Sequence, residues 1–373
     1  MGTIQRAPIA LSVIGASHVK AGIPCQDSSD AGSLGEWHYA IVADGHSSER
    51  YFRSDRGAKF AVNVLRSAFH KAALSKNVEP VDLITEWKTW SDSWVLENWL
   101  RQVREDLLAD PPSIGGSTEV EFGLKRLLER IMTLQGYAGI VTFGNQINGF
   151  EEFARSRRGD SKDASSIVDT QSMDVRNDAN EKWQIRAYGS TLLGLMVKSD
   201  CILWFQLGDG ALIEVHDDDA TYLVPPPESA IGNETPSLCM VTARDFVNVG
   251  GVTLSQLNDS DTFLVSSDGL PNSYDFPEGF LAFCTDLCKV AQAGSDIDKT
   301  LESWLPRISQ KGSGDDMSIA AIFPIMSDDV DMLKPAIVGT SVALGDEVKS
   351  IQEIETSDTF DYPNPEDMDA QNR

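Results

Sequence analysis

Short apolar runs separated by polar loops recur along the chain and predict a protein rich in β-strands. The run at 38–43 is nearly continuous in apolar character, as expected for a strand that is covered on both faces. Runs at 9–15, 201–207, 262–267 and 317–323 also predict strands. Several of these runs end abruptly at or near an aspartate.

Two other regions predict further strands. Runs at 211–215 and 220–224 indicate a hairpin across the acidic turn at 217–219. Strand character also returns over 184–197, with the Gly-Ser-Thr sequence of 189–191 inside the predicted strand.

Helical periodicity appears between these strands. Phe60, Val64, Leu65 and Ala68 recur at helical spacing and predict an amphipathic helix over 57–75. Further helices are predicted at 81–108, 118–134, 278–293 and 296–309. The helix at 81–108 is rich in tryptophan, and spaced tryptophans of this kind favour packing in the core over a ligand platform.

Two polar segments set the expected domain organisation. Residues 145–182 are rich in Asn, Asp, Ser, Arg and Lys and have no period, so we expect an exposed, partly disordered insertion. Residues 326–373 carry many acidic and few basic residues, which predicts a disordered, solvated acidic tail, with a docking or autoinhibitory segment as the alternative. The remaining sequence predicts one domain over 1–325.

The charge and the termini limit the expected partners. A formal net charge of −26 opposes binding to nucleic acid or to anionic membranes, so neither is expected as a partner. The sequence has no run of about 18 apolar residues and no clear signal peptide, so we expect a cytoplasmic protein and, by default, a monomer. The five widely spaced cysteines are expected to be reduced thiols.

Candidate chemistry lies where the apolar runs meet aspartates. Asp44, Asp209 and Asp268 each follow a run and precede a glycine, and Asp315 stands just before the last run. Carboxylates at the edge of an apolar core repel one another and lose hydration, so they persist most easily when cations lie among them. Ligation by oxygen alone favours Mg²⁺ or Mn²⁺ over zinc. The alternative is an ordinary Asp-Gly turn after each strand.

Further short motifs reduce the weight of that alternative. In order along the chain they are Gln26-Asp27, Val42-Ala43-Asp44-Gly45-His46, Tyr188-Gly189-Ser190-Thr191, Leu207-Gly208-Asp209-Gly210, Val265-Ser266-Ser267-Asp268-Gly269-Leu270 and Gly314-Asp315-Asp316-Met317-Ser318. In order, spacing and strand context, residues 9–324 resemble the metal-dependent type 2C protein serine/threonine phosphatases. A subset of bacterial members is similar at the first segment, where Ser-His precedes Cys-Gln-Asp.

The resemblance implies an α+β fold of two packed antiparallel β-sheets flanked by helices, with a two-metal site between the sheets at one end. Asp44 would bridge two Mn²⁺ or Mg²⁺ ions, and the carbonyl of Gly45 would add a ligand. Asp268 and Asp315 would complete the coordination of the first ion, and Asp27 would hold metal-bound water.

The resemblance also implies roles around these ligands. Asp209 would contact the metal ligands without touching the first two ions, or would help Asp268 to bind a third, weaker ion. His46 matches a position that acts as general acid to the leaving alkoxide, a task that suits an imidazole with a near-neutral pKa. Its alternative is an exposed turn histidine near the site.

Three positions depart from the family pattern. Gln26 stands where many members have a carboxylate, and Asp316 replaces the usual Asn. Gly22 occupies the position of the usual phosphate-binding Arg, so His18 or Lys20 is predicted to contact the substrate phosphate. Gln26 and Asp316 are expected to lie behind the metal ligands.

The function implied is metal-dependent hydrolysis of phosphoserine and phosphothreonine in proteins, by direct attack of water activated between two ions. The partners would be phosphorylated proteins and a cognate serine/threonine kinase or its targets in a signalling system. The departures leave two alternatives open, a pseudophosphatase that acts as a regulatory binding module and a hydrolase for small phosphate esters.

Overall fold

The computed structural model describes residues 6–75, 78–112, 184–225, 235–254 and 261–324. These residues belong to one compact unit that spans Met1–Asp329. The helix predicted at 118–134, the insertion at 145–182 and the tail at 326–373 lie outside the described residues. The proposed boundaries of the domain and the tail therefore stay predictions.

Ten strands form two antiparallel five-stranded sheets. The first sheet has the order β1 (Arg6–Val13), β10 (Met317–Pro324), β9 (Thr262–Ser266), β6 (Ala211–His216) and β7 (Asp219–Val224). The second has the order β2 (Ser28–Leu34), β3 (Trp37–Ala43), β4 (Leu192–Lys198), β5 (Cys201–Leu207) and β8 (Asn248–Thr253). The hairpin predicted across 217–219 is confirmed as β6 and β7.

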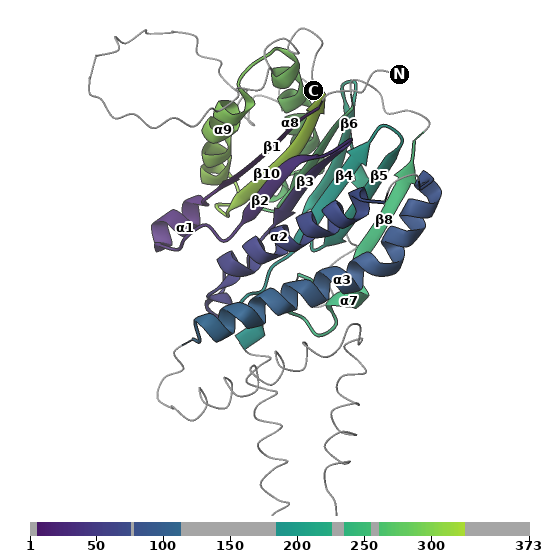
Figure 1. The fold of residues 1–373 in the computed structure, drawn as a ribbon. Helices are drawn as coiled ribbons and strands as arrows, with labels where there is room; N and C mark the ends of the chain where they lie inside the picture. The colour runs from purple at the N-terminus through teal and green to yellow at the C-terminus, as the bar shows by residue number, and fades with distance from the viewer. Residues whose placement is uncertain (1–5, 76–77, 113–183, 226–234, 255–260, 325–373) are drawn as a thin grey trace, which may run out of the picture. The chain divides into compact units, whose positions relative to one another are not determined.

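The longer helices cover the outer faces of the sheets (Figure 1). They are α2 (Ser54–Ala73) and α3 (Pro80–Ala109) on the second sheet, and α8 (Pro277–Gln292) and α9 (Ile297–Lys311) on the first. Two short helices are α1 (Ala16–Ala21), which follows β1, and α7 (Ala243–Phe246), which precedes β8. Between the sheets, a core of Val42, Leu195, Val265 and Ile322 with their neighbours excludes water. The predicted fold class, two packed antiparallel sheets flanked by helices, is confirmed.

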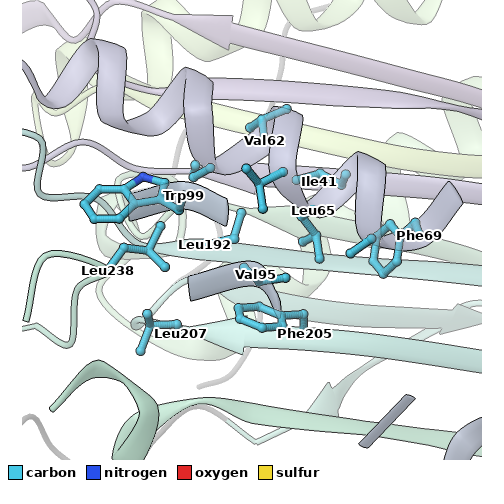
Figure 2. Packing of buried hydrophobic residues seen from close by; sticks show 14 of the residues in the cluster. Ile41, Val62, Leu65, Phe69, Val95, Trp99, Leu192, Phe205, Leu207 and Leu238 are labelled. Carbon is cyan, nitrogen blue, oxygen red and sulfur yellow. The ribbon is translucent and has the colours of Figure 1, made fainter. Parts of the chain in front are cut away.

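The outer core of the second sheet explains the helical pattern of the sequence. Leu65 and Phe69 of α2 and Trp99 of α3 face Ile41 and Phe205 of the sheet (Figure 2). Trp87 and Trp99 are fully buried, as predicted for the tryptophan-rich helix, and the Trp99 indole N–H donates to the carbonyl of Gly57 at 3.0 Å. Within the described residues, no helix combines the length and apolar character needed to cross a membrane.

The strand predicted over 184–197 is wrong in its first half. The chain is helical at 184–186 and then turns, and the strand begins only at Leu192. Ala187 and Tyr188 are buried against α2 and not within a sheet, since a Cβ on Gly57 would overlap the carbonyl oxygen of Tyr188. Apolar residues buried against a helix gave this segment its strand-like pattern.

A buried charged network holds this turn against the end of α3. The Arg53 guanidinium donates to the Tyr188 hydroxyl at 2.6 Å and to the Asp110 carbonyl at 2.6 Å. The Tyr188 hydroxyl donates in turn to the Asp106 carboxylate at 2.5 Å, and Arg56 donates to the same carboxylate at 2.9 Å. The network joins α2 and α3 to the segment that leads into Gly-Ser-Thr at 189–191.

Gly57→Ala tests the close contact between α2 and this turn. Alanine favours a helix by less than about 1 kcal/mol over glycine, whereas overpacking costs about 1–3 kcal/mol, so we expect a net loss of roughly 1–2 kcal/mol in urea unfolding. Gly279→Ala in α8 is the matched control, because its nearest neighbour is a Tyr274 ring carbon at 3.0 Å, which can move. Equal effects of the two substitutions would contradict the contact.

Candidate active site

Strand register places the predicted acidic residues at one end of each sheet. Ser28 of β2 pairs with Ala43 of β3, so Asp27 and Asp44 lie at the same end. Val42 pairs with Leu193 and Leu192 with Leu207, which brings Asp209 to that end of the second sheet. In the first sheet, Ser266 pairs with Ile319, so Asp268 after β9 and Asp315 before β10 share an end.

Asp44 is held by its backbone as well as by its position after β3. Its N–H donates to the Thr191 hydroxyl at 3.0 Å, and its carbonyl accepts the Thr191 N–H at 2.8 Å. Gly45 pairs with Ser190, and a Cβ on Gly45 would lie only 2.5 Å from the carbonyl oxygen of Gln26. The glycine after Asp44 is therefore required by a close approach of backbone. Thr191 belongs to a sequence motif, but its role in holding Asp44 is visible only in the structure.

Electrostatics show that the carboxylates from the two sheets meet. Burial raises the pKa of Asp44 well above its ordinary value, and the neighbouring charges of Asp27 and Asp268 raise it further. Burial likewise raises the pKa of Asp27 to about 7. The pKa of Asp268 rises to about 6, first through burial and then through the charges of Asp209 and Asp315. Asp44 stands between a carboxylate of its own sheet and one of the other sheet.

Unpaired buried oxygens show that this cluster suits cations. Asp27 is 5% exposed, and neither of its carboxylate oxygens has a hydrogen-bond partner in the described residues. The hydroxyls of Ser267 and Ser318 are near enough to favour its ionised form, but neither makes a well-formed hydrogen bond to it. The Oδ1 atom of Asp209 is also buried without a partner, while its Oδ2 accepts from the Thr235 hydroxyl at 2.9 Å.

The described side chains do not form a ready-made metal cage. No three His, Cys, Asp or Glu side chains among them are grouped as they would be around a bound ion. The carboxylates instead meet as neighbouring pairs, Asp27 with Asp44 and Asp44 with Asp268. Oxygen donors, unpaired buried atoms and raised pKa values together fit a hard divalent cation.

Adjacent aspartates at the start of β10 have different environments. Asp315 has a side chain 47% exposed and lies beside His18, with Nε2 and Oδ1 3.5 Å apart. Asp316 is buried, and its carboxylate accepts the backbone N–H of Gly15 and the backbone N–H of Gln26, both at 2.6 Å. Asp316 thus ties the end of β1 and the segment before Asp27 to β10, which supports its predicted position behind the ligands.

The predicted phosphate contacts lie in and around α1. His18 is 6% exposed, and its Nδ1 lies 2.9 Å from Oδ1 of Asp316, so its ring is directed at the aspartates. Lys20 is exposed on α1. Gln26 is buried and donates its side-chain amide to the Ser54 hydroxyl at 2.6 Å. The contact of His18 or Lys20 with phosphate stays a prediction.

His46 belongs to a group of rings and guanidinium groups beside the carboxylates. Its backbone N–H donates to the Gly189 carbonyl at 3.2 Å, and its half-buried ring lies 4.6 Å from the ring of Tyr51. The guanidinium carbons of Arg50 and Arg186 lie 5.0 and 5.8 Å from the Tyr51 ring centre. His46 is predicted from the sequence, whereas Tyr51 and the two arginines are not, because they come together only through the turn before Gly189.

The fold and the site define a two-sheet sandwich with an acidic, cation-suited cluster at one end. The sequence model of the family described as Protein phosphatase 2C matches residues 14–306. The chain belongs to this family, whose members are protein serine/threonine phosphatases. No curated protein gave a match to the sequence.

Solved structures similar to this chain include bacterial phosphatases. PppA of Pseudomonas aeruginosa, described as a key regulatory component of T6SS, is 15% identical, with 86% of this chain and 99% of that chain covered at a TM-score of 0.45. The S. agalactiae serine/threonine phosphatase is 13% identical, with 86% of this chain and 100% of that chain covered at a TM-score of 0.45. A third structure is the catalytic domain of the serine/threonine phosphatase PstP in complex with two manganese ions. It is 12% identical, with 86% of this chain and 99% of that chain covered at a TM-score of 0.44.

Substituting the adjacent aspartates should separate stability from metal binding. Asp316→Ala leaves two buried N–H groups without an acceptor, and at about 1–3 kcal/mol each we expect a loss of roughly 2–4 kcal/mol in urea unfolding. Asp315→Ala is the matched control, since its half-exposed side chain should change stability little and weaken Mn²⁺ binding in calorimetric titration. The opposite pattern would refute the assigned roles.

The raised pKa values predict a pH-dependent effect of metal on stability. Asp27 and Asp268 bind protons more tightly in the folded protein, with pKa values of about 7 and about 6 against an ordinary 3.8. The stability of the folded protein without metal therefore falls as the pH rises from about 4 to about 7. A divalent cation replaces these protons, so Mn²⁺ should raise the melting temperature more at about pH 8 than at about pH 5. An equal shift at both pH values, or an equal effect of K⁺, would contradict the assignment.

Proposed function

We propose that this chain hydrolyses phosphoserine and phosphothreonine esters in proteins, using two Mn²⁺ or Mg²⁺ ions held by the carboxylate cluster. The observation that carries the proposal is that Asp44 neighbours both Asp27 of its own sheet and Asp268 of the other sheet, while both buried carboxylate oxygens of Asp27 lack a hydrogen-bond partner among the described residues. Family membership supports the reaction class. Repelling carboxylates of this kind are stabilised by cations.

The position of each carboxylate suggests its role toward the ions. Asp44 neighbours both Asp27 and Asp268, so it would contribute to holding both ions. Asp268 and Asp315 would serve one ion, with the Gly45 carbonyl as a further donor. Asp209, beside Asp268, would support a third, weaker ion. When bound, the ions would supply an activated water and stabilise negative charge on the phosphate.

The residues of the chain would orient the ester and manage the proton. Phosphorus gains a bond to a water oxygen and loses its bond to the serine or threonine oxygen. That leaving oxygen requires a proton, which the imidazolium form of His46 would donate, and the proton released by the attacking water would return the imidazole to that form. The packing of His46 against Tyr51 and its backbone bond to Gly189 support this role, because they restrict where the ring can lie.

Gln26 and Asp316 support an active site more than a degenerate one. Both departures from the family pattern make specific buried hydrogen bonds, Gln26 to Ser54 and Asp316 to the backbone at Gly15. These bonds position the segment that carries Asp27. The substrate protein, an opposing kinase, the monomeric state and the cytoplasmic location stay predictions.

Removing a central carboxylate should abolish metal-dependent phosphatase activity. In Asp44→Asn and in Asp268→Asn, release of phosphate from a phosphothreonine peptide and from p-nitrophenyl phosphate should fall by roughly 100-fold or more, because the cations lose a charged ligand. Asp218→Asn is the control, since that carboxylate is 78% exposed on the β6–β7 hairpin.

The outcomes separate the alternatives. Full activity of the unaltered protein after chelation would contradict the proposal. Absence of Mn²⁺ binding in calorimetry would favour a binding module. Hydrolysis of p-nitrophenyl phosphate without hydrolysis of phosphopeptides would favour a small phosphate ester as substrate.

A further inference from the structure

The acidic site presents an electrostatic problem for a phosphorylated substrate. Two divalent cations would bring four positive charges to the five carboxylates of Asp27, Asp44, Asp209, Asp268 and Asp315, in a chain whose net charge is −26. A phosphate ester on a protein carries about −1.5 to −2 charges near neutral pH. Protein cations beside the site are therefore needed to attract and orient the phosphate.

Arg50 and Arg186 are cations held beside the site. The ring of Tyr51 is 5% exposed, and the two guanidinium groups lie over it at 5.0 and 5.8 Å. Arginine stacks well on aromatic rings, and this contact limits the positions that the long side chain can adopt. His46 lies against the same ring at 4.6 Å.

Short backbone contacts connect this group to Asp44. The Gly189 N–H donates to the Arg186 carbonyl at 3.0 Å, and the Gly189 carbonyl accepts from His46. A Cβ on Gly189 would lie 2.6 Å from Tyr51 and 2.9 Å from His46, so the Arg186 turn is packed directly on both rings. Two residues further on, Thr191 holds Asp44.

Neighbouring arginines have a different environment. Arg53 is 8% exposed and donates to the Tyr188 hydroxyl and the Asp110 carbonyl. Arg56 is bound by the carboxylates of Asp106 and Asp110 at 2.9 and 2.7 Å. Both are part of the network that holds α2 to α3. Arg50 is exposed and Arg186 is half-buried, and both guanidinium groups lie at the Tyr51 ring, where Arg186 also interacts with the Tyr51 hydroxyl.

We propose that Arg186, assisted by Arg50, binds the phosphate group of the substrate on the Tyr51 side of the carboxylate cluster. The planar guanidinium group matches two phosphate oxygens at once, which the Lys20 ammonium on α1 cannot do. The inference rests on the proposed phosphatase function and adds the residues that recognise the phosphate. His46, which follows Asp44 by two residues, packs on the same Tyr51 ring as both arginines.

The test measures steady-state hydrolysis of a phosphothreonine peptide with Mn²⁺ in Arg186→Ala, Arg186→Lys and Arg50→Ala. A hydrogen bond to a charged group contributes about 1.5–3 kcal/mol, so Arg186→Ala should raise KM and the Ki of inorganic phosphate by roughly 10- to 100-fold. Arg186→Lys should recover part of this loss, and Arg50→Ala should show a smaller rise. Lys299→Ala is the control for loss of one positive charge, since that side chain is 81% exposed on α9.

Calorimetric affinity for Mn²⁺ should be unchanged in the arginine variants, which separates phosphate binding from damage to the metal ligands. If Arg186→Ala does not fold, Arg186→Lys and Arg50→Ala decide the question. Values of KM and Ki within twofold of the unaltered protein would overturn the inference. A KM raised for the peptide, with an unchanged Ki for inorganic phosphate and unchanged hydrolysis of p-nitrophenyl phosphate, would also overturn it, because the arginines would then bind another part of the peptide.

Binding without turnover distinguishes failure of this inference from failure of the proposed function. A fluorescent peptide with a non-hydrolysable phosphonate in place of the phosphate should bind the unaltered protein with Mn²⁺ and bind Arg186→Ala at least about tenfold more weakly. Absence of hydrolysis by the unaltered protein would refute the phosphatase proposal alone. Equal binding of the phosphonate peptide by both proteins would refute the role of Arg186 alone.

Discussion

Mutual repulsion of carboxylates at the end of a dry, two-sheet core is the constraint on which the rest of this structure depends. Asp27, Asp44 and Asp268 lose hydration through burial, which raises the pKa of all three, and the charges of Asp27 and Asp268 raise the pKa of Asp44 further. Such a group stays together only if the surrounding backbone cannot move apart. The antiparallel register meets this need, because strand ends joined by ladder hydrogen bonds cannot separate independently.

Hydrogen bonds outside the ladders complete the restraint. Asp316 accepts backbone N–H groups from two segments that are far from it in sequence, and Thr191 binds both backbone groups of Asp44. The turn that carries Thr191 is itself tied to α2 and α3 through Tyr188 and Arg53. The positions of the carboxylates therefore also depend on α2 and α3, although neither helix contributes a carboxylate to the cluster.

The sequence predicted the central strands well but missed both edge strands of the second sheet, for a physical reason. β3, β5, β9 and β10 are buried inside their sheets, so selection for burial leaves a nearly continuous apolar run. β2 and β8 are the edges of the second sheet, and their Ser, Gly and Asn residues resemble a loop, so neither was predicted. The error over 184–191 has a related cause, since burial there comes from α2.

Part of the candidate site could also be predicted from the sequence, and part could not. Aspartates at strand ends are visible in the sequence because the strand and the motif are local, and Asp44, Asp209, Asp268 and Asp315 were found on that basis. The grouping of Arg186 with Tyr51 depends on a turn and on the packing of segments more than 130 residues apart, so no local pattern indicates it. The different environments of Asp315 and Asp316 likewise arise from contacts with Gly15 and Gln26.

The geometry of Gly22 gives a reason why phosphate recognition would move to another element. Gly22 ends α1 in the left-handed conformation, with φ at 69°, and its N–H caps the carbonyls of His18 and Val19. The space around it is open, so the backbone conformation and not crowding disfavours a larger residue there. An arginine at this position would strain the turn that ends the helix carrying His18, whose ring lies between Asp315 and Asp316. A guanidinium group presented by the Arg186 turn avoids that conflict, because the Arg186 backbone is bonded to Gly189 and takes no part in the turn that ends α1.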